Sequence, residues 1–178
     1  MSGGATQAAE TAVGRLYDYG GNDLADICDA ATAAIEQGGG FGWLRPPPRN
    51  VLEAFWRGVL LVPELALFVA RLDGVIAGAA LLVRPPRSQE ARAHAASVSS
   101  FFVAPWARGY GLAPGLLETC EEEARREGYT VLNLDVRETQ TRAIQIFQTR
   151  GYHRWGADKK YARVGGRYVT GLFFQKDL

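Results

Sequence analysis

The sequence has little cysteine, little net charge and no long apolar run. Its two cysteines, Cys28 and Cys120, fall in helical patterns without metal-ligand spacing, so we expect buried thiols in a reducing compartment. The net charge of +1 argues against a nucleic-acid partner, because such proteins usually carry a clustered basic face. No apolar stretch reaches the roughly 20 residues that cross a bilayer. No secretory signal or metal-binding cluster is recognised either, which predicts a cytoplasmic protein without membrane partners.

The length and pattern of the chain favour one domain. Its 178 residues suit a single core, and no internal repeat or linker interrupts them. Residues 1–10 are small and polar and are predicted to be a mobile tail. Residues 11–178 are predicted to form the domain.

Apolar spacing predicts alternating helices and strands, and therefore a mixed α/β fold. The turn dipeptide Asp73-Gly74 joins two apolar runs and is a strong hairpin signal. The strand that ends at Val103 is expected to place Ser97, Ser99, Phe101 and Val103 on one face by simple alternation. Expected strands are Ala12–Tyr17, Leu65–Leu72, Val75–Val83, Ser97–Val103, Thr130–Val136, Tyr152–Ala162 and Arg167–Lys176, and expected helices are Asp23–Gln37, Arg49–Leu61, Leu112–Glu127 and Thr139–Arg150.

Two helical faces are predicted from residue spacing. In the second helix the inward residues are expected to be Val51, Leu52, Phe55, Trp56 and Val59. In the third helix, Glu121 and Glu122 precede Arg125 and Arg126 by four residues, which predicts exposed ion pairs on a solvated face.

The junction between the fourth strand and the third helix has the chemistry of an anion site. Arg108-Gly109-Tyr110-Gly111-Leu112-Ala113 stands between an apolar run and a helical pattern. The first N–H groups of a helix are unpaired and carry partial positive charge, glycine lets a ligand approach the backbone, and Arg108 adds a permanent cation. Pro114 fits because the first turn of a helix requires no donor there.

Two segments of the chain resemble the GNAT superfamily of acetyl-coenzyme A-dependent N-acetyltransferases. The Arg108–Ala113 segment is similar to that family's pyrophosphate signature, Arg/Gln-x-x-Gly-x-Gly/Ala. Ala143–Tyr152 is similar to its Ala-x-x-Leu-Tyr-x-x-x-Gly-Phe segment, and the order of elements also matches. The aromatic loop Phe41–Leu44 and the C-terminal tail look like the tabtoxin-resistance-like branch.

The resemblance implies a mixed, mostly antiparallel sheet that is splayed between its fourth and fifth strands and flanked by about four helices. It implies that acetyl-coenzyme A is the acyl donor and that a primary amine on a small molecule attacks it directly in a ternary complex. A homodimer is also implied. The residues expected to bind the cofactor are Phe102, Val103, Arg108, Gly109, Tyr110, Gly111, Leu112, Ala113, Gln140, Ala143 and Phe147.

The chain departs from the family pattern at two positions that usually serve in catalysis. Ser97 stands where a glutamate base is common, and Phe147 stands where a tyrosine often protonates the leaving thiolate. The catalytic residues are therefore unassigned. The candidates are Asp135 and Ser97, Asp135 because it can act as a base directly or through water.

Other groups and other functions stay open. His94 has a side chain that can act as an acid or a base, but it precedes a strand. Tyr161 or Tyr168 can reach a leaving sulfur only if the C-terminal hairpin folds over the cleft. The alternatives to an enzyme are a non-catalytic acyl-coenzyme A-binding module and an interaction domain in which the glycines only form a turn. A dinucleotide-binding domain is disfavoured because the glycine pattern has one glycine too few.

Overall fold

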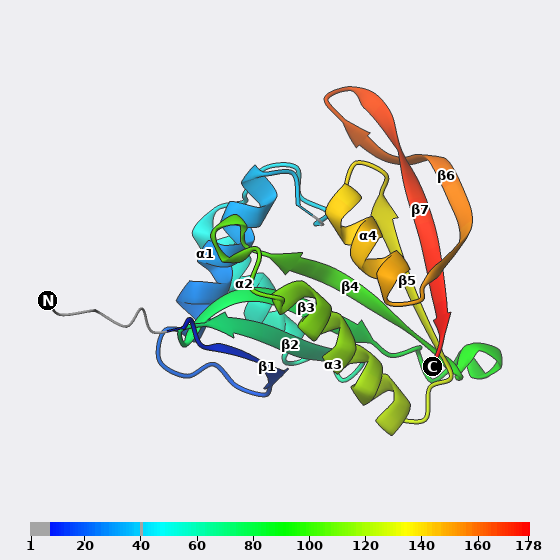
Figure 1. The fold of residues 1–178 in the computed structure, drawn as a ribbon, viewed down its shortest axis with the longest axis horizontal. Coiled ribbons are helices and arrows are strands. Elements are labelled where there is room, and N and C mark those ends of the chain that lie inside the picture. Colours follow the sequence, from blue (N-terminus) through cyan, green and yellow to red (C-terminus); the bar gives the residue numbers. More distant parts are fainter. Residues whose placement is uncertain (1–7, 40) are drawn as a thin grey trace, which may run out of the picture.

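The computed structural model describes residues 8–39 and 41–178, and these form one mixed sheet with helices on both faces (Figure 1). The predicted α/β class is confirmed, and most element boundaries agree within two residues. The predicted mobile tail lies largely outside the described residues. The strands are β1 (Thr11–Leu16), β2 (Leu65–Leu72), β3 (Val75–Val83), β4 (Ala95–Val103), β5 (Val131–Arg137), β6 (His153–Val164) and β7 (Arg167–Asp177); the helices are α1 (Asp23–Glu36), α2 (Arg49–Val59), α3 (Leu112–Arg126) and α4 (Thr141–Thr149), with short 3₁₀ turns η1 (Glu90–Arg92) and η2 (Pro105–Ala107).

The sheet has the strand order β1-β2-β3-β4-β5-β7-β6. Neighbouring strands are antiparallel except β4 and β5, which run parallel. The predicted β2–β3 hairpin is confirmed, because Leu72 pairs with Val75 and the turn residues Asp73 and Gly74 both have positive φ, 50° and 83°. No helix in the described part of the chain combines the length and the apolar character needed to span a bilayer.

Two apolar cores lie on opposite faces of the sheet. The first packs α3 and α4 against one face, and the second packs α1 and α2 against the other. Leu52, Trp56 and Val59 of α2 are buried as predicted, whereas Phe55 is only partly buried. The prediction for Val51 was wrong: it is 41% exposed, because the apolar stripe of this short helix is narrower than the spacing suggested.

Strand β4 does not alternate as predicted. Its register against β3 passes from Ser99 opposite Leu81 to Phe102 opposite Ala79, so β4 contains one extra residue, and Ser100 has a φ of 47°. A β-bulge of this kind reverses the faces of the residues that follow it. Val98 therefore shares a core with Phe101 and Val103, while Phe102 enters the opposite core.

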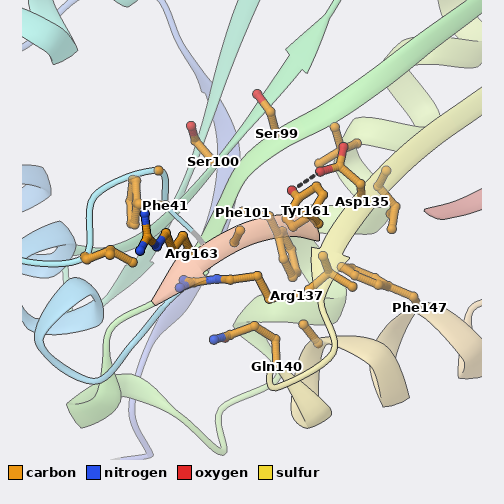
Figure 2. A pocket seen from close by; sticks show the side chains of 17 residues that line it. Phe41, Ser99, Ser100, Phe101, Asp135, Arg137, Gln140, Phe147, Tyr161 and Arg163 are labelled. Atoms are coloured by element: carbon orange, nitrogen blue, oxygen red, sulfur yellow. Dashed lines mark hydrogen bonds between the residues drawn. The ribbon is translucent and has the colours of Figure 1, made fainter. Parts of the chain in front are cut away.

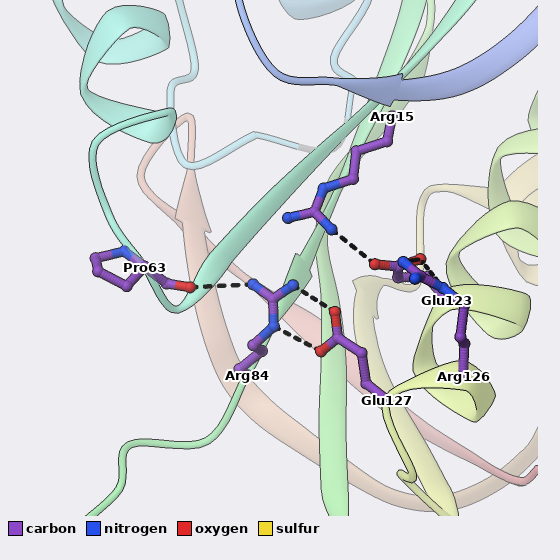
Figure 3. Close-up of polar contacts among 6 residues, drawn as sticks. All are labelled: Arg15, Pro63, Arg84, Glu123, Arg126 and Glu127. Atoms are coloured by element: carbon purple, nitrogen blue, oxygen red, sulfur yellow. Dashed lines mark hydrogen bonds and ion pairs between the residues drawn. The ribbon is translucent and has the colours of Figure 1, made fainter.

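Two carboxylates of helix α3 and that of its C-cap residue Glu127 pair with cations from other segments of the chain. Glu127 forms a two-pronged pair with Arg84 beyond the end of β3, at 2.5 and 2.6 Å, and Glu123 accepts a 2.7 Å bond from Arg15 of β1 (Figure 3). The third, Glu121, is only 1% exposed and accepts bonds from Arg150 at 3.0 Å and Lys176 at 2.8 Å. The prediction of a solvated face was wrong for Glu121, because cations from distant segments pair with it in the interior.

Replacement of Glu121 by glutamine is expected to lower the free energy of unfolding by about 3 kcal/mol, because Arg150 and Lys176 lose a buried partner. Burial alone would raise the pKa of Glu121, but the hydrogen bonds and charges of Arg150 and Lys176 outweigh it and hold that pKa below its usual value. The stabilisation is therefore present above the unfolded-state pKa and is lost as pH falls through the folded-state pKa.

Urea unfolding of Glu121→Gln and wild type at neutral and acidic pH measures this difference, which should shrink towards acid. Glu122→Gln is the matched control, since Glu122 is exposed on the same helix. Equal stability of Glu121→Gln and Glu122→Gln at neutral pH would contradict the expectation.

Candidate active site

The sheet opens between β4 and β5. The two strands pair only from Ala95 opposite Val131 to Ser97 opposite Asn133, and they part before the bulge at Ser100. The predicted splay is thereby confirmed. A bulge bends its strand, so this one accounts for the divergence. The result is a β4 edge that faces an opening instead of a partner strand.

One cavity, of about 470 Å³, lies where the end of β4, the start of α3 and the start of α4 meet. We call it the junction cavity. Most of the predicted cofactor residues line it, but Tyr110 and Phe147 do not; Tyr110 is 48% exposed outside it. The predicted residues on its wall are Phe102, Val103, Arg108, Gly109, Gly111, Leu112, Ala113, Gln140 and Ala143.

The Arg108–Ala113 segment has the backbone of an anion cradle. Gly109 and Gly111 have φ of 89° and 74°, in the left-handed region that favours glycine. Gly111 is the N-cap of α3, so the N–H groups of Leu112 and Ala113 belong to its first, unpaired turn. An added Cβ at either glycine would meet no described atom within 4 Å, so space for a ligand adjoins this backbone.

The loop after α1 closes one side of the opening. Gly38, with a φ of 74°, and Gly39 end α1 by donating their N–H groups to Ile35 and Ala34, a Schellman motif. The carbonyl oxygen of Gly39 then accepts a 2.5 Å bond from Arg137, and that of Gly38 accepts bonds from Arg137 and Gln140.

Gln37, also in this loop, accepts a 3.1 Å bond from Arg108. The sequence predicted only that a helix ends at Gln37, where successive glycines follow, and so Gln37 and Gly39 were missed as cavity residues. The only signal available was the density of glycines.

A second cavity, of about 520 Å³, is lined by residues of β4, β5 and β6, and we call it the acceptor cavity (Figure 2). It shares Phe101, Gln140 and Ala143 with the junction cavity, so the two adjoin. Its other lining residues are Phe41, Gly42, Leu44, Val98, Ser99, Ser100, Leu134, Asp135, Val136, Arg137, Phe147, Tyr161, Ala162 and Arg163.

Asp135 and Tyr161 meet in the acceptor cavity (Figure 2). The Tyr161 hydroxyl donates a hydrogen bond to Asp135 Oδ2. The ring of Tyr161 crosses β7 above Gly171, where an added Cβ would lie 2.1 Å from Tyr161 Cγ, so only glycine leaves room for it. Burial, and then the hydrogen bond to Asp135, raise the pKa of Tyr161, which therefore stays protonated at neutral pH.

The catalytic candidates other than Asp135 and Tyr161 lie outside both cavities. Ser97 is paired with Asn133 before the splay, and neither cavity is lined by Ser97, His94 or Tyr168. Phe147 is buried against Phe101, at 5.6 Å between ring centroids, and contributes an apolar wall. The structure thus brings Asp135 and Tyr161 together and sets the other candidates apart.

Comparison with known proteins identifies the family of this chain. The sequence profile of the acetyltransferase (GNAT) family matches residues 24–152. The chain is 58% identical, over 75% of its own length and 79% of the relative's, to an uncharacterized N-acetyltransferase in the hisH-hisA intergenic region of Azospirillum brasilense. It is 29% identical to an IAA acetyltransferase of the same organism, over 67% and 72% of the two chains.

Solved structures share the fold. A ribosomal-protein-alanine N-acetyltransferase from Brucella melitensis superimposes with a TM-score of 0.77 at 23% identity, over 94% of this chain and 99% of that one. The Salmonella typhimurium protein yncA, solved with its cofactor acetyl-CoA, gives 0.76 at 21% identity, over 95% and 94%. The fold, the splayed sheet and the matched profile together show that this chain belongs to the acetyltransferase (GNAT) family.

Proposed function

We propose that this protein transfers the acetyl group of acetyl-coenzyme A to a primary amine on a small molecule, by direct attack in a ternary complex. The observation that carries the proposal is a pair of adjoining cavities in one splayed sheet, with an anion cradle in the first and a carboxylate in the second. Family membership supports acetyl transfer in general. The amine acceptor and the mechanism are our inference from the site.

The junction cavity suits the acyl donor. The amides of Gly109 to Ala113, the dipole of α3 and the Arg108 guanidinium can bind the pyrophosphate. The free edge of β4 at Phe102 and Val103 can pair with the amides of the pantetheine arm, as in strand addition. Gln140 and Ala143 stand between the two cavities, where the arm would end. Phe147 lines the acceptor cavity instead, and the Tyr110 side chain is exposed outside both cavities.

The acceptor cavity supplies a base. An amine with a pKa of about 10 arrives protonated and must lose one proton before it can attack. Asp135 can accept that proton, directly or through water, and Tyr161 holds its carboxylate toward the cavity. The bound donor supplies the electrophile: the amine nitrogen bonds to the acetyl carbon, the carbon–sulfur bond breaks, and the thiolate takes up the second amine proton.

The test is a calorimetric titration of the protein with acetyl-coenzyme A, followed by measurement of thiol release with a panel of primary amines. Saturable binding and amine-dependent thiol release are expected. Absence of binding would refute the proposal. Binding without turnover by any amine would favour a non-catalytic acyl-coenzyme A-binding module. Homodimer formation, the cytoplasmic location and the tabtoxin-resistance-like branch stay predictions.

Replacement of Tyr161 by phenylalanine is expected to lower kcat/KM by about tenfold, the scale of one hydrogen bond to a charged group. The Asp135 carboxylate then loses the hydrogen bond that orients it, so the loss should appear in kcat. Tyr168→Phe is the control, since Tyr168 lines neither cavity. A kcat equal to that of wild type would show that Tyr161 does not position the base.

A further inference from the structure

The acceptor cavity has a carboxylate on one side and two arginine side chains on another. Asp135 and Tyr161 form one side, while the Arg137 and Arg163 side chains lie on another with Phe41 (Figure 2). Arg137 donates to the carbonyl oxygens of Gly38 and Gly39, which are neutral and leave its charge uncompensated. The Arg163 side chain makes no hydrogen bond or ion pair with any described residue.

Strand geometry explains why these four side chains project into the same cavity. Asp135 and Arg137 are two residues apart on β5, and Tyr161 and Arg163 are two residues apart on β6, so each pair projects from one face of its strand. The strand between them, β7, carries Gly171 opposite Arg137. Because Gly171 has no side chain, groups from β6 can reach across β7 into the cavity. The pairing of β6 with β7 is also irregular between Asp158 and Ala162, which is where Tyr161 enters.

We propose that the acceptor carries an acidic group, a carboxylate or a phosphonate, in addition to its primary amine. This inference rests on the proposed function. The amine binds beside Asp135, and the acidic group binds to the Arg163 guanidinium within the positive field of Arg137. Arginine is suited to this role, because its planar fork matches both anions and stays charged at all relevant pH values. Small amino acids and aminoalkylphosphonates are the simplest members of this class.

The experiment compares acceptors that differ only in the acidic group. Amino acids, their carboxamides and an aminoalkylphosphonate are supplied with acetyl-coenzyme A, and kcat/KM is measured by thiol release. The acids are expected to exceed the amides by about 10- to 100-fold, the range of a charge-assisted hydrogen bond. An amide lacks the carboxylate charge, so its amine has a lower pKa and loses its proton more easily. This effect favours the amides and therefore opposes the expected result. Comparison of carboxylate with phosphonate then identifies the favoured anion.

Arg163→Gln should reduce the acid-over-amide ratio about tenfold, through loss of activity on the acids, and Arg163→Lys should restore part of it. Arg154→Gln is the matched control, because Arg154 is exposed on the same strand and lines neither cavity. A wild-type ratio near one, or a ratio unchanged in Arg163→Gln, would overturn the inference while leaving the proposed function intact.

If no acceptor is acetylated, binding separates the two hypotheses. Calorimetry with the coenzyme A-saturated protein would then show Arg163-dependent binding of acids over amides if the inference holds and only the proposed reaction fails. Equal binding of acids and amides, or no binding of either, would overturn the inference as well.

Discussion

Replacement of Gly111 by glutamate is expected to weaken coenzyme A binding by about 100-fold or more while the protein remains folded. Gly111 caps α3 at the junction cavity, and an added Cβ there points into open space. A carboxylate side chain would therefore enter the volume that we assign to the pyrophosphate. Like charges about 4 Å apart repel by about 4 kcal/mol at an effective dielectric of 20, so the expected loss is large.

Gly111→Gln separates charge from backbone strain. Both replacements force an L residue into a φ of 74°, at a shared cost of about 1–2 kcal/mol in stability. Only glutamate adds charge repulsion against the pyrophosphate. Calorimetric titration with coenzyme A, together with thermal unfolding of both variants, gives the two quantities. Equal affinities for the two variants would remove the electrostatic argument, and wild-type affinity in Gly111→Glu would refute the assignment of the site.

Replacement of Asp135 by asparagine is expected to lower kcat by about 10²- to 10⁴-fold near neutral pH, the usual cost of losing a general base. Asparagine keeps the size of the side chain, and its carbonyl oxygen can still accept the Tyr161 hydrogen bond, so the cavity should keep its shape. The defect should diminish as pH rises toward the amine pKa of about 10, because the acceptor then arrives already deprotonated.

The pH dependence of kcat for wild type and Asp135→Asn measures this effect. Asp158→Asn is the control, since Asp158 is an exposed residue of β6 that lines neither cavity. Affinity for acetyl-coenzyme A should be unchanged in both variants. A loss of the same size at every pH would indicate that Asp135 shapes the cavity and does not accept a proton.

The parts of the fold that sequence reasoning predicted well depend on neighbours in the chain. The β2–β3 hairpin follows from Asp73-Gly74, because a two-residue turn with positive φ specifies its own geometry. The junction at Arg108–Ala113 was located for the same reason, since a strand end, two glycines and a helix start are consecutive.

The parts that it missed depend on residues far apart in the chain. The bulge at Ser100 reversed the predicted faces of β4 because alternation assumes one residue for each partner residue. Glu121 was predicted to be exposed because its i,i+4 partner is visible in the sequence, whereas Arg150 and Lys176 are not neighbours until the chain folds.

The sequence by itself determined the family, the α/β class and the place of the anion cradle, since these depend on consecutive residues and their spacing. The tertiary structure alone decided which residues line the acceptor cavity. Asp135 lies beside Tyr161 only because Gly171, on the strand between them, has no side chain to block the tyrosine ring. The carbonyl groups of Gly38 and Gly39 reach Arg137 only across the splayed sheet. Such contacts join separate strands and loops, and no local pattern encodes them. The anion cradle was therefore predictable, and the chemistry beside it was not.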